Sequence, residues 1–361
     1  MESISEKHVL NGRKQIILIV ILTISTFALA LFSMGLGSSS QLDMFSTMKI
    51  IFDTGQFSCI FEISEVFPCN QDIQSQIVWN LRFPRIMMGM ITGVALATAG
   101  ALMQGCLGNP LVSPLTLGVA SGAALGAAFA IVLNLSFIPI PELAIVANAF
   151  LFSLIVVAII IQLGNIRRSI SAESYILVGI AITFIAGAIV STMQYFATDA
   201  QLSQLTHWSF GSLSRPDLVN TIWIGLVIIC LMPIVFIWAW DLNTLSLGGD
   251  EFAISTGVEP VTTRRNILII SALMTSIVIS FTGLIGFVGL AAPHMSRLLI
   301  GNDYRKLIPC SAVFGAFLVV FADTVGRTLF APIVIPVGIM LSIIGGPFFM
   351  YLLLQNRGHA H

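Results

Sequence analysis

Long apolar runs alternate with short polar segments along almost the whole chain. About 20 apolar residues cross the hydrocarbon core of a bilayer, and ten runs come close to this length. They span residues 16–36, 86–106, 114–133, 142–164, 173–195, 219–240, 266–282, 284–300, 307–325 and 336–354. The pattern predicts an all-α polytopic membrane protein of about ten transmembrane helices, with boundaries least certain at 86–133 and 266–300, where tight breaks join two runs.

The polar segments between the runs divide the chain into loops and tails. Residues 1–15 form a polar tail, and the run after it is too long for the apolar part of a signal peptide, so we expect an uncleaved first span. We expect residues 16–356 to form a single transmembrane domain and residues 357–361 to form a second tail. Within that domain, residues 37–80 form a long external loop and residues 241–265 form the longest internal loop.

Composition and charge fit a lipid environment. The chain is 57% hydrophobic and 9% charged, whereas a soluble domain has about 25% charged residues. The net charge of −1 comes with no basic run for nucleic acid. An N-terminus in the cytoplasm places most of the 16 Lys and Arg residues in inner segments, so the positive-inside rule predicts both termini in the cytoplasm of a cell (inner) membrane protein.

Small residues and Gly/Pro breaks mark where the predicted spans pack together. Small residues every fourth position, as from Gly89 to Gly105, let helix backbones approach closely in lipid. Irregular backbone at membrane depth is tolerated only where it is buried in protein or faces a cavity, and two breaks five spans apart suggest inverted half-repeats. The residues expected to serve packing or the pathway are Gly93, Gly100, Gln104, Asn109, Pro110, Gly118, Gly122, Gly283, Gly286, Gly289, Pro293 and His294.

Three blocks of the sequence resemble the FecCD family. They are residues 82–122 (RFPR…MQG…NPLVSP…LGVASG), Gly283–Arg297 (GLIGFVGLAAPHMSR) and Ala322–Leu354, in order and with family-like spacing. The resemblance implies a permease subunit of an ABC importer for ferric siderophores, haem or vitamin B12, with a bundle like that of vitamin B12 permeases. It also implies a second permease copy or paralogue, two copies of an ATPase subunit and an extracytoplasmic substrate-binding protein.

Three arginines at external span ends run against the positive-inside bias. The resemblance implies that Arg82, Arg85 and Arg327 meet acidic side chains of the binding protein. Bidentate Arg–carboxylate pairs suit such a contact. Two other interpretations remain open from the residues alone: snorkelling to lipid head groups, and pairing of Arg327 with Asp323 one turn earlier.

The internal loop 241–265 mixes apolar, small and charged residues, which is typical of two short helices broken at Gly257. The resemblance implies that this loop lies in a groove of the ATPase and transmits its closure, a helix-in-groove contact; a solvated surface loop is the alternative. The residues expected to carry the coupling are Leu247, Gly248, Asp250, Glu251, Phe252 and Gly257.

Catalytic and metal-binding patterns are missing from the sequence. No lysine follows a glycine, so there is no P-loop, and we expect a transporter subunit whose ATP hydrolysis occurs on another chain. No ligand cluster for a metal occurs, and no cofactor is expected. His294 is the one ionisable residue well inside a predicted span, which leaves no visible proton relay.

The cargo and the mode of transport rest on the resemblance. A ferric siderophore or similar iron chelate is expected, with haem, cobalamin and molybdate as alternatives. A self-sufficient secondary transporter would depend on an intramembrane polar group, with His294 or Gln104 as candidates. A membrane-embedded enzyme would need a reactive cluster that the sequence does not offer.

The cysteines divide into two groups. Cys106, Cys230 and Cys310 lie in or beside spans and are expected to act as small apolar residues. Cys59 and Cys69 lie in the external loop, on the oxidising side of a bacterial membrane, where they could form a disulfide.

Overall fold

The structure is a computed structural model that describes residues 4–36, 44–52, 73–166 and 172–355. Cys59 and Cys69 lie outside these residues, and their disulfide stays a prediction. Within the described ranges the chain forms helices and no strand, so the predicted all-α class is confirmed. The helices are α1 (Ile4–Gly35), α2 (Met44–Phe52), α3 (Ile73–Gln76), the π-helical η2 (Ile77–Arg82), α4 (Phe83–Cys106), α5 (Val119–Val132), α6 (Pro141–Ile166), α7 (Ala172–Phe196), α8 (Asp199–Ser209), α9 (Leu218–Ile237), α10 (Ala239–Ser255), α11 (Pro260–Thr282), α12 (Val288–Ile300), α13 (Tyr304–Thr328) and α14 (Val337–Gln355).

Each of the ten predicted spans corresponds to a helix. In the described part of the chain, seven helical segments are long and apolar enough to cross a membrane. They are Gly12–Gly35, Ile73–Cys106, Leu143–Leu163, Ala172–Phe196, Leu218–Ile237, Pro260–Thr282 and Tyr304–Thr328. The other three predicted spans are the shorter apolar helices α5 and α14 and the 13-residue α12. The chain is therefore a multi-pass membrane protein.

The segment Ile73–Cys106 is longer than the sequence indicates. It is continuous over 34 residues, although its first residues are placed in the external loop by the sequence pattern. Polar residues such as Asn80 and Arg82 interrupt the apolar run there, and the π-helical turn η2 carries the helix through them. At about 1.5 Å per residue, the extra turns lift this helix beyond the hydrocarbon core at its outer end.

The two tight breaks extend from between the predicted spans into the second span of each pair and shorten two helices. Residues 107–118 and 283–287 are not helical, so the spans predicted at 114–133 and 284–300 begin too early. Gly118 and Gly283 have φ values of 86° and 79°, a conformation open to glycine that stops a regular helix. As a result, α5 and α12 begin inside the bundle rather than at its surface.

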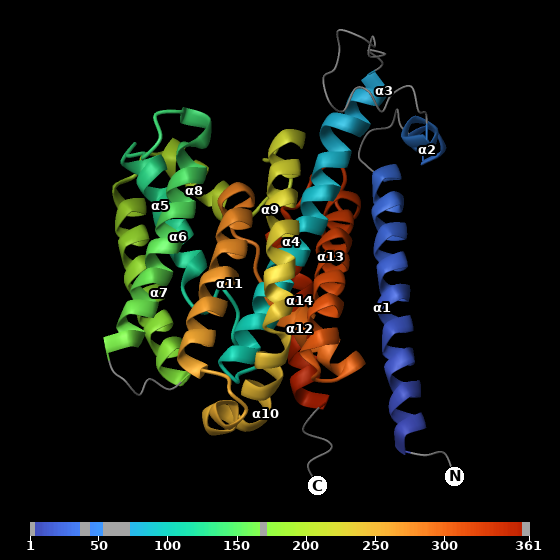
Figure 1. The fold of residues 1–361 in the computed structure, drawn as a ribbon. Coiled ribbons are helices and arrows are strands. Elements are labelled where there is room, and N and C mark those ends of the chain that lie inside the picture. The colour runs from blue at the N-terminus through green and yellow to red at the C-terminus, as the bar shows by residue number, and fades with distance from the viewer. Residues whose placement is uncertain (1–3, 37–43, 53–72, 167–171, 356–361) are drawn as a thin grey trace.

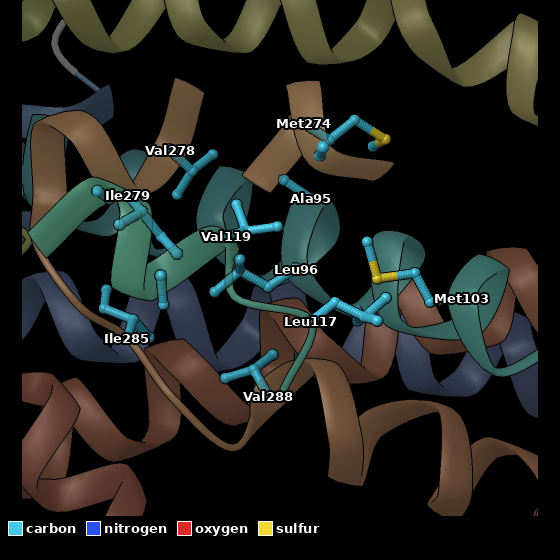
Figure 2. Close-up of a cluster of buried hydrophobic side chains, with 14 of the residues drawn as sticks. Ala95, Leu96, Met103, Leu117, Val119, Met274, Val278, Ile279, Ile285 and Val288 are labelled. Carbon is cyan, nitrogen blue, oxygen red and sulfur yellow. The ribbon is translucent and has the colours of Figure 1, made fainter. Parts of the chain in front are cut away.

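The two irregular segments pack against each other and against α4. An added Cβ at Gly289 would lie 3.2 Å from Pro114 Cδ and 2.9 Å from the carbonyl oxygen of Leu96. Figure 2 shows Leu117 and Ile285, from the two irregular segments, and Val119 and Val288, the first residues of α5 and α12, around Leu96. The backbone of both breaks is thus enclosed by protein, as irregular structure at membrane depth requires.

Helix α4 runs through the middle of the bundle and touches α13, α11, α12 and α9. Small residues permit this closeness: a Cβ at Gly93 would overlap with the backbone of Gly315 on α13, and one at Gly100 with that of Gly289 on α12. Gly122 of α5 lies in the same way against the backbone of α6 at Phe152, 2.8 Å from an added Cβ. Helix packing in lipid depends on such approaches.

The described ends of the chain lie at one end of the bundle, together with α10, and α2, α3 and α8 lie at the other (Figure 1). We name these the inner end and the outer end. Side-chain contacts join the helices at the inner end: Gln15 of α1 donates to the carbonyl oxygen of Ile300 at 2.8 Å and accepts from Lys306 at 2.6 Å. The placement of both described ends of the chain together agrees with an even number of spans.

Candidate functional site

Asp323 organises a polar cluster at the outer end. It lies on α13 with its side chain 2% exposed. Its carboxylate accepts from Arg85 of α4, with Nη2 2.8 Å and Nε 3.0 Å from Oδ1, and from Nε of Arg327 at 2.9 Å. The pairing of Arg327 with Asp323, one of the interpretations open from sequence, is therefore present.

Two of the arginines also hold the outer end of α1. Arg327 donates to the carbonyl oxygens of Leu36 at 3.0 Å and Ser33 at 3.2 Å, and Arg82 donates to that of Met34 at 2.7 Å. The last carbonyls of a helix lack partners within it and favour cations. The sequence alone gives no sign of this role, because the partners are backbone atoms of a helix far away in the chain.

The three arginines differ in how open they are. Arg82 and Arg327 are each 6% exposed, whereas the side chain of Arg85 is 14% exposed and reaches Ser214 Oγ with Nη1 at 2.7 Å. All three line one hollow of about 340 Å³, together with Asn80, Pro84 and Ser214 among others. We call it the outer hollow; among the described residues, three guanidinium groups and the buried carboxylate of Asp323 give it a net positive charge.

At the inner end, α10 has a buried face and an exposed apolar face. Leu242, Leu245 and Ala253 are buried against the bundle, while Leu247, Phe252 and Ile254 are 78%, 45% and 64% exposed. Large apolar side chains exposed beyond the membrane at the end of a bundle are typical of a protein-binding surface. The predicted coupling residues Leu247 and Phe252 lie on this exposed face, and Glu251 beside them is exposed too.

The predicted break at Gly257 is present, because α10 ends at Ser255 and α11 begins at Pro260, and α10 has a second break that the sequence did not predict. Gly249 has a φ of 67° and a ψ of −161°, and it divides α10 into two parts, with Gly248 packed against Phe252. Gly257, with a φ of 87°, instead lies just beyond the end of α10. The sequence pattern predicted the break at Gly257 and missed the kink at Gly249, because a Gly between polar residues gives the same signal for a kink and for a helix end.

Arg264 joins α10 to α4, a role that the sequence pattern does not reveal. It lies on the first turn of α11 and is 6% exposed. Its Nη1 donates to Asp250 Oδ2 at 2.8 Å, its Nη2 pairs with Oδ1 of the same carboxylate, and its Nε donates to the carbonyl oxygen of Cys106 at 2.7 Å. In the sequence, the Arg264–Arg265 pair indicates only that this loop is positively charged and lies on the inner side of the membrane.

Asn243 joins the first part of α10 to the turn before α13. It donates to Asp303 Oδ1 at 2.9 Å and accepts from the backbone N–H of Tyr304 at 2.8 Å. Hydrogen bonds from the Arg305 side chain, and a further one from Asn243, lower the pKa of Asp303 to about 2. Arg305 also lies over the ring of Trp240, 4.4 Å from its centroid.

The predicted polar residues inside the bundle lie close to the inner end. Gln104 of α4 donates to the carbonyl oxygen of Leu290 at 3.4 Å and accepts from Arg297 at 3.3 Å. His294 lies on α12, one residue after Pro293 and one turn before Arg297. Asn109 accepts from the backbone N–H of Leu111 at 2.9 Å, next to Pro110, so it shapes the turn that leads into residues 107–118.

The cysteines and the acidic residues offer no metal site in the described part of the chain. No group of three or more His, Cys, Asp or Glu side chains lies together there. Cys106 and Cys310 are buried in the bundle, and Cys230 is exposed on α9.

The bundle of spans contains two irregular segments, a charged hollow at its outer end and a helix with an exposed apolar face at its inner end. These features are typical of a membrane transport subunit. A family model described as the FecCD transport family matches residues 16–355. The chain belongs to this family, and it is an ABC importer permease of the metal-chelate type.

Relatives from several organisms agree with this assignment. The chain is 39% identical to MJ0087 of Methanocaldococcus jannaschii, over 98% of each chain. It is 38% identical to the hemin transport system permease HmuU of Yersinia pestis, over 78% of this chain and 84% of HmuU. It is 33% identical to the vitamin B12 import permease BtuC of Vibrio vulnificus, over 81% and 86% of the two chains.

A solved structure shares the fold. It is described as an inward-facing conformation of a metal-chelate type ABC transporter and superposes with a TM-score of 0.78 at 26% identity. The match covers 94% of this chain and 99% of that one, so the likeness extends over nearly the whole bundle.

Proposed function

We propose that this permease moves an iron(III)–siderophore or a related iron chelate into the cytoplasm. The observation that carries the proposal is the likeness, over almost the whole chain, to a transporter described as metal-chelate type. Relatives named for iron chelatin transport in Helicobacter pylori, at 34% identity over 87% of this chain, support iron as the metal. Haem is the second candidate cargo, because HmuU carries hemin in its name and is 38% identical to this chain over 287 residues.

The energy for transport comes from a separate ATPase subunit, present in two copies, that binds α10. Two features support this. The chain has no P-loop of its own, and α10 exposes Leu247, Phe252 and Ile254 at the inner end. A short helix with an exposed apolar edge suits insertion into a groove of a partner.

A substrate-binding protein docks at the outer end and delivers the chelate. The outer hollow supports this role because guanidinium groups outnumber carboxylates among its described residues. An acidic side chain entering it would meet Arg85 first, since Arg82 and Arg327 are buried and hold the end of α1. Arg85 would then serve the contact, and the other two would supply charge behind it.

A second permease copy or a close paralogue completes the pathway. The exposed side chains of α7, among them Leu177, Phe184 and Ile185 at 66%, 75% and 61% exposure, leave that helix free to face lipid or a partner. The chelate would pass between the two copies.

Docking is tested by charge reversal at Arg85. Arg85→Glu should weaken binding of the binding protein to the purified permease by about tenfold or more, since truncating close interfacial charge pairs costs several kcal/mol. Lys49→Glu, on the exposed Lys49 of α2, is the control and should leave binding unchanged. Equal affinity for Arg85→Glu and the unmodified protein would remove Arg85 from the docking contact.

The cargo is tested by uptake into vesicles that hold the permease, its ATPase and its binding protein. ATP-dependent uptake of a radiolabelled iron–siderophore is expected. Uptake of haem with no uptake of iron–siderophore would replace the first candidate by the second, and uptake of neither would reject both.

A further inference from the structure

We propose that Arg264 is the positioning residue that passes movement of α10 to the irregular segment 107–118. This inference rests on the proposed function in one respect, namely that α10 receives the ATPase. Arg264 touches neither partner nor cargo; it acts by holding two other groups together, the Asp250 carboxylate and the Cys106 carbonyl. Three features support this role: the bonds of Arg264, the division of α10 into two parts, and the position of Cys106 directly before the irregular segment.

The bonds of Arg264 add polar links between α10, α11 and α4, which also pack against one another. Its guanidinium group binds both oxygens of Asp250, which lies in the second part of α10, and the backbone carbonyl of Cys106, the last residue of α4. Arginine is suited to this because its planar fork binds a carboxylate with two N–H groups while Nε remains for a third acceptor. The Arg264 side chain is buried, so its bond to the Cys106 carbonyl is shielded from water, whereas the Asp250 carboxylate is partly exposed.

The two parts of α10 are attached to different helices. The first part is held by Asn243 to Asp303 and Tyr304, at the start of α13. The second part begins after Gly249 and is held through Asp250 to Arg264. A partner that pushes on the second part can therefore turn it about Gly249 while the first part stays fixed, and the displacement acts on Arg264.

Cys106 is the point from which that displacement reaches the core. Residues 107–118 come directly after it and lead into α5. Pro114 in this segment packs against Gly289 of α12, as the position of an added Cβ shows at 3.2 Å, and Leu115 packs against Gly286 at 3.3 Å. Because protein interiors are close-packed and transmit strain, a shift of the Cys106 carbonyl is passed to both irregular segments.

A purely structural role is the alternative, in which Arg264 only locks the inner end of the bundle. The two roles differ in what a substitution does. Loss of a lock lowers stability and reduces ATP hydrolysis and transport in proportion. Loss of a positioning residue leaves hydrolysis in place and lowers the amount of cargo moved for each ATP hydrolysed.

The experiment compares Arg264→Lys and Arg264→Gln with the control Arg265→Gln in the full importer, reconstituted in vesicles with ATPase and binding protein. Arg265 is the exposed neighbour of Arg264 on the same turn. We expect both Arg264 variants to keep the ATPase bound and to move about tenfold less cargo per ATP, within the range of ordinary coupling energies. Lysine keeps the positive charge but lacks the planar guanidinium group with its several N–H donors. Arg264→Lys should therefore be more stable than Arg264→Gln and still move less cargo per ATP. The proposal is overturned if either Arg264→Lys or Arg264→Gln moves as much cargo per ATP as the unmodified importer.

Two further variants keep the test decisive. If the Arg264 variants do not fold, Asp250→Asn is used, because the Asp250 side chain is 46% exposed; it should also lower the ratio, and an unchanged ratio contradicts the proposal. Leu247→Asp tests the proposed function separately. If that variant and a matching Phe252→Asp bind the ATPase normally, α10 is not its binding site, whatever the Arg264 variants do.

Discussion

Asp323 is the residue on which the charge balance of the outer hollow depends. Its carboxylate is almost fully buried and is bonded to both Arg85 and Arg327. A buried ion pair adds little compared with a well-packed apolar pair, but removing one partner leaves an uncompensated charge. Without the Asp323 carboxylate, Arg85 and Arg327 would keep their charge but lose the acceptor that they share.

Asp323→Asn should therefore destabilise the protein by about 3–5 kcal/mol. The expected result is a clear fall in the thermal transition of the purified permease in detergent. Asp199→Asn is the control, because Asp199 is exposed in the first turn of α8, and it should change the transition little. A transition for Asp323→Asn equal to that of the control would mean that the cluster does not depend on its carboxylate.

Gly100 is a residue whose role is set by the space around it. A Cβ there would overlap with the backbone of Gly289 on α12, and backbone gives way less easily than a side chain. Gly100→Val should lower stability by at least about 1–3 kcal/mol, the usual cost of overpacking. Gly187→Val on α7, where nothing lies within 4 Å of an added Cβ, is the matched control in the same thermal assay. Equal transitions for the two variants would contradict the close approach of α4 and α12.

Individual residues also differ in how far the sequence predicts their roles. Apolar runs and small-residue spacing indicate the helices and the packing glycines, because both depend on local pattern. Arg264 could not be predicted, because a charge counts as surface in any hydrophobic pattern and its partner Asp250 lies 14 residues earlier, across a helix end. The contact of Arg82 with the carbonyl of Met34 is equally invisible, since every residue offers that acceptor.

At the scale of the element, α10 combines two anchors with one break. Asn243 holds the first part and Asp250 the second, and Gly249 lies between them with a backbone conformation that favours glycine. The sequence predicted short helices with a break at Gly257, where α10 does end, but it did not predict the kink at Gly249. Only the backbone angles separate a kink from a helix end.

The anchor at Asp303 should make the inner end sensitive to acid. Its pKa is lowered to about 2 by the Arg305 side chain and by Asn243, and a carboxylate with a depressed pKa stabilises the folded state above its unfolded pKa of about 4. That contribution is lost as the pH falls from about 4 to about 2. Asp303→Asn should be less stable than the unmodified protein at neutral pH, with a difference that shrinks across this window. Thermal transitions measured from about pH 7 to about pH 3 check this, and a difference that stays constant to the acid end of that range would contradict it.

The irregular segments are the other element that sequence patterns describe only in part. The Gly/Pro breaks at 108–110 and 283–293 indicate where regular helix ends, but the predicted spans at 114–133 and 284–300 still include backbone that is not helical. Apolar residues such as Leu117 and Ile285 continue the hydrophobic run through these segments. Hydropathy measures burial, and a buried irregular segment reads the same as a buried helix.

At the scale of the whole molecule, the chain connects two ends of a membrane bundle. Arg85, Asp323 and Arg327 join α4 and α13 at the outer end, and Arg264 joins α10, α11 and α4 at the inner end. Helix α4 belongs to both clusters and passes the two irregular segments between them. A permease driven from inside and supplied from outside needs such a connection.

Dependence on a separate ATPase is the property of this permease on which its other proposed roles rest. Purification of the tagged protein from its native membranes in mild detergent, with identification of the chains that come with it, tests this dependence directly. We predict a stoichiometric partner that carries a P-loop. Two results together would contradict the prediction. The first is a protein that is pure, with no such partner, when purified from membranes that contain the ATPase. The second is chelate uptake that continues in cells from which that ATPase has been deleted.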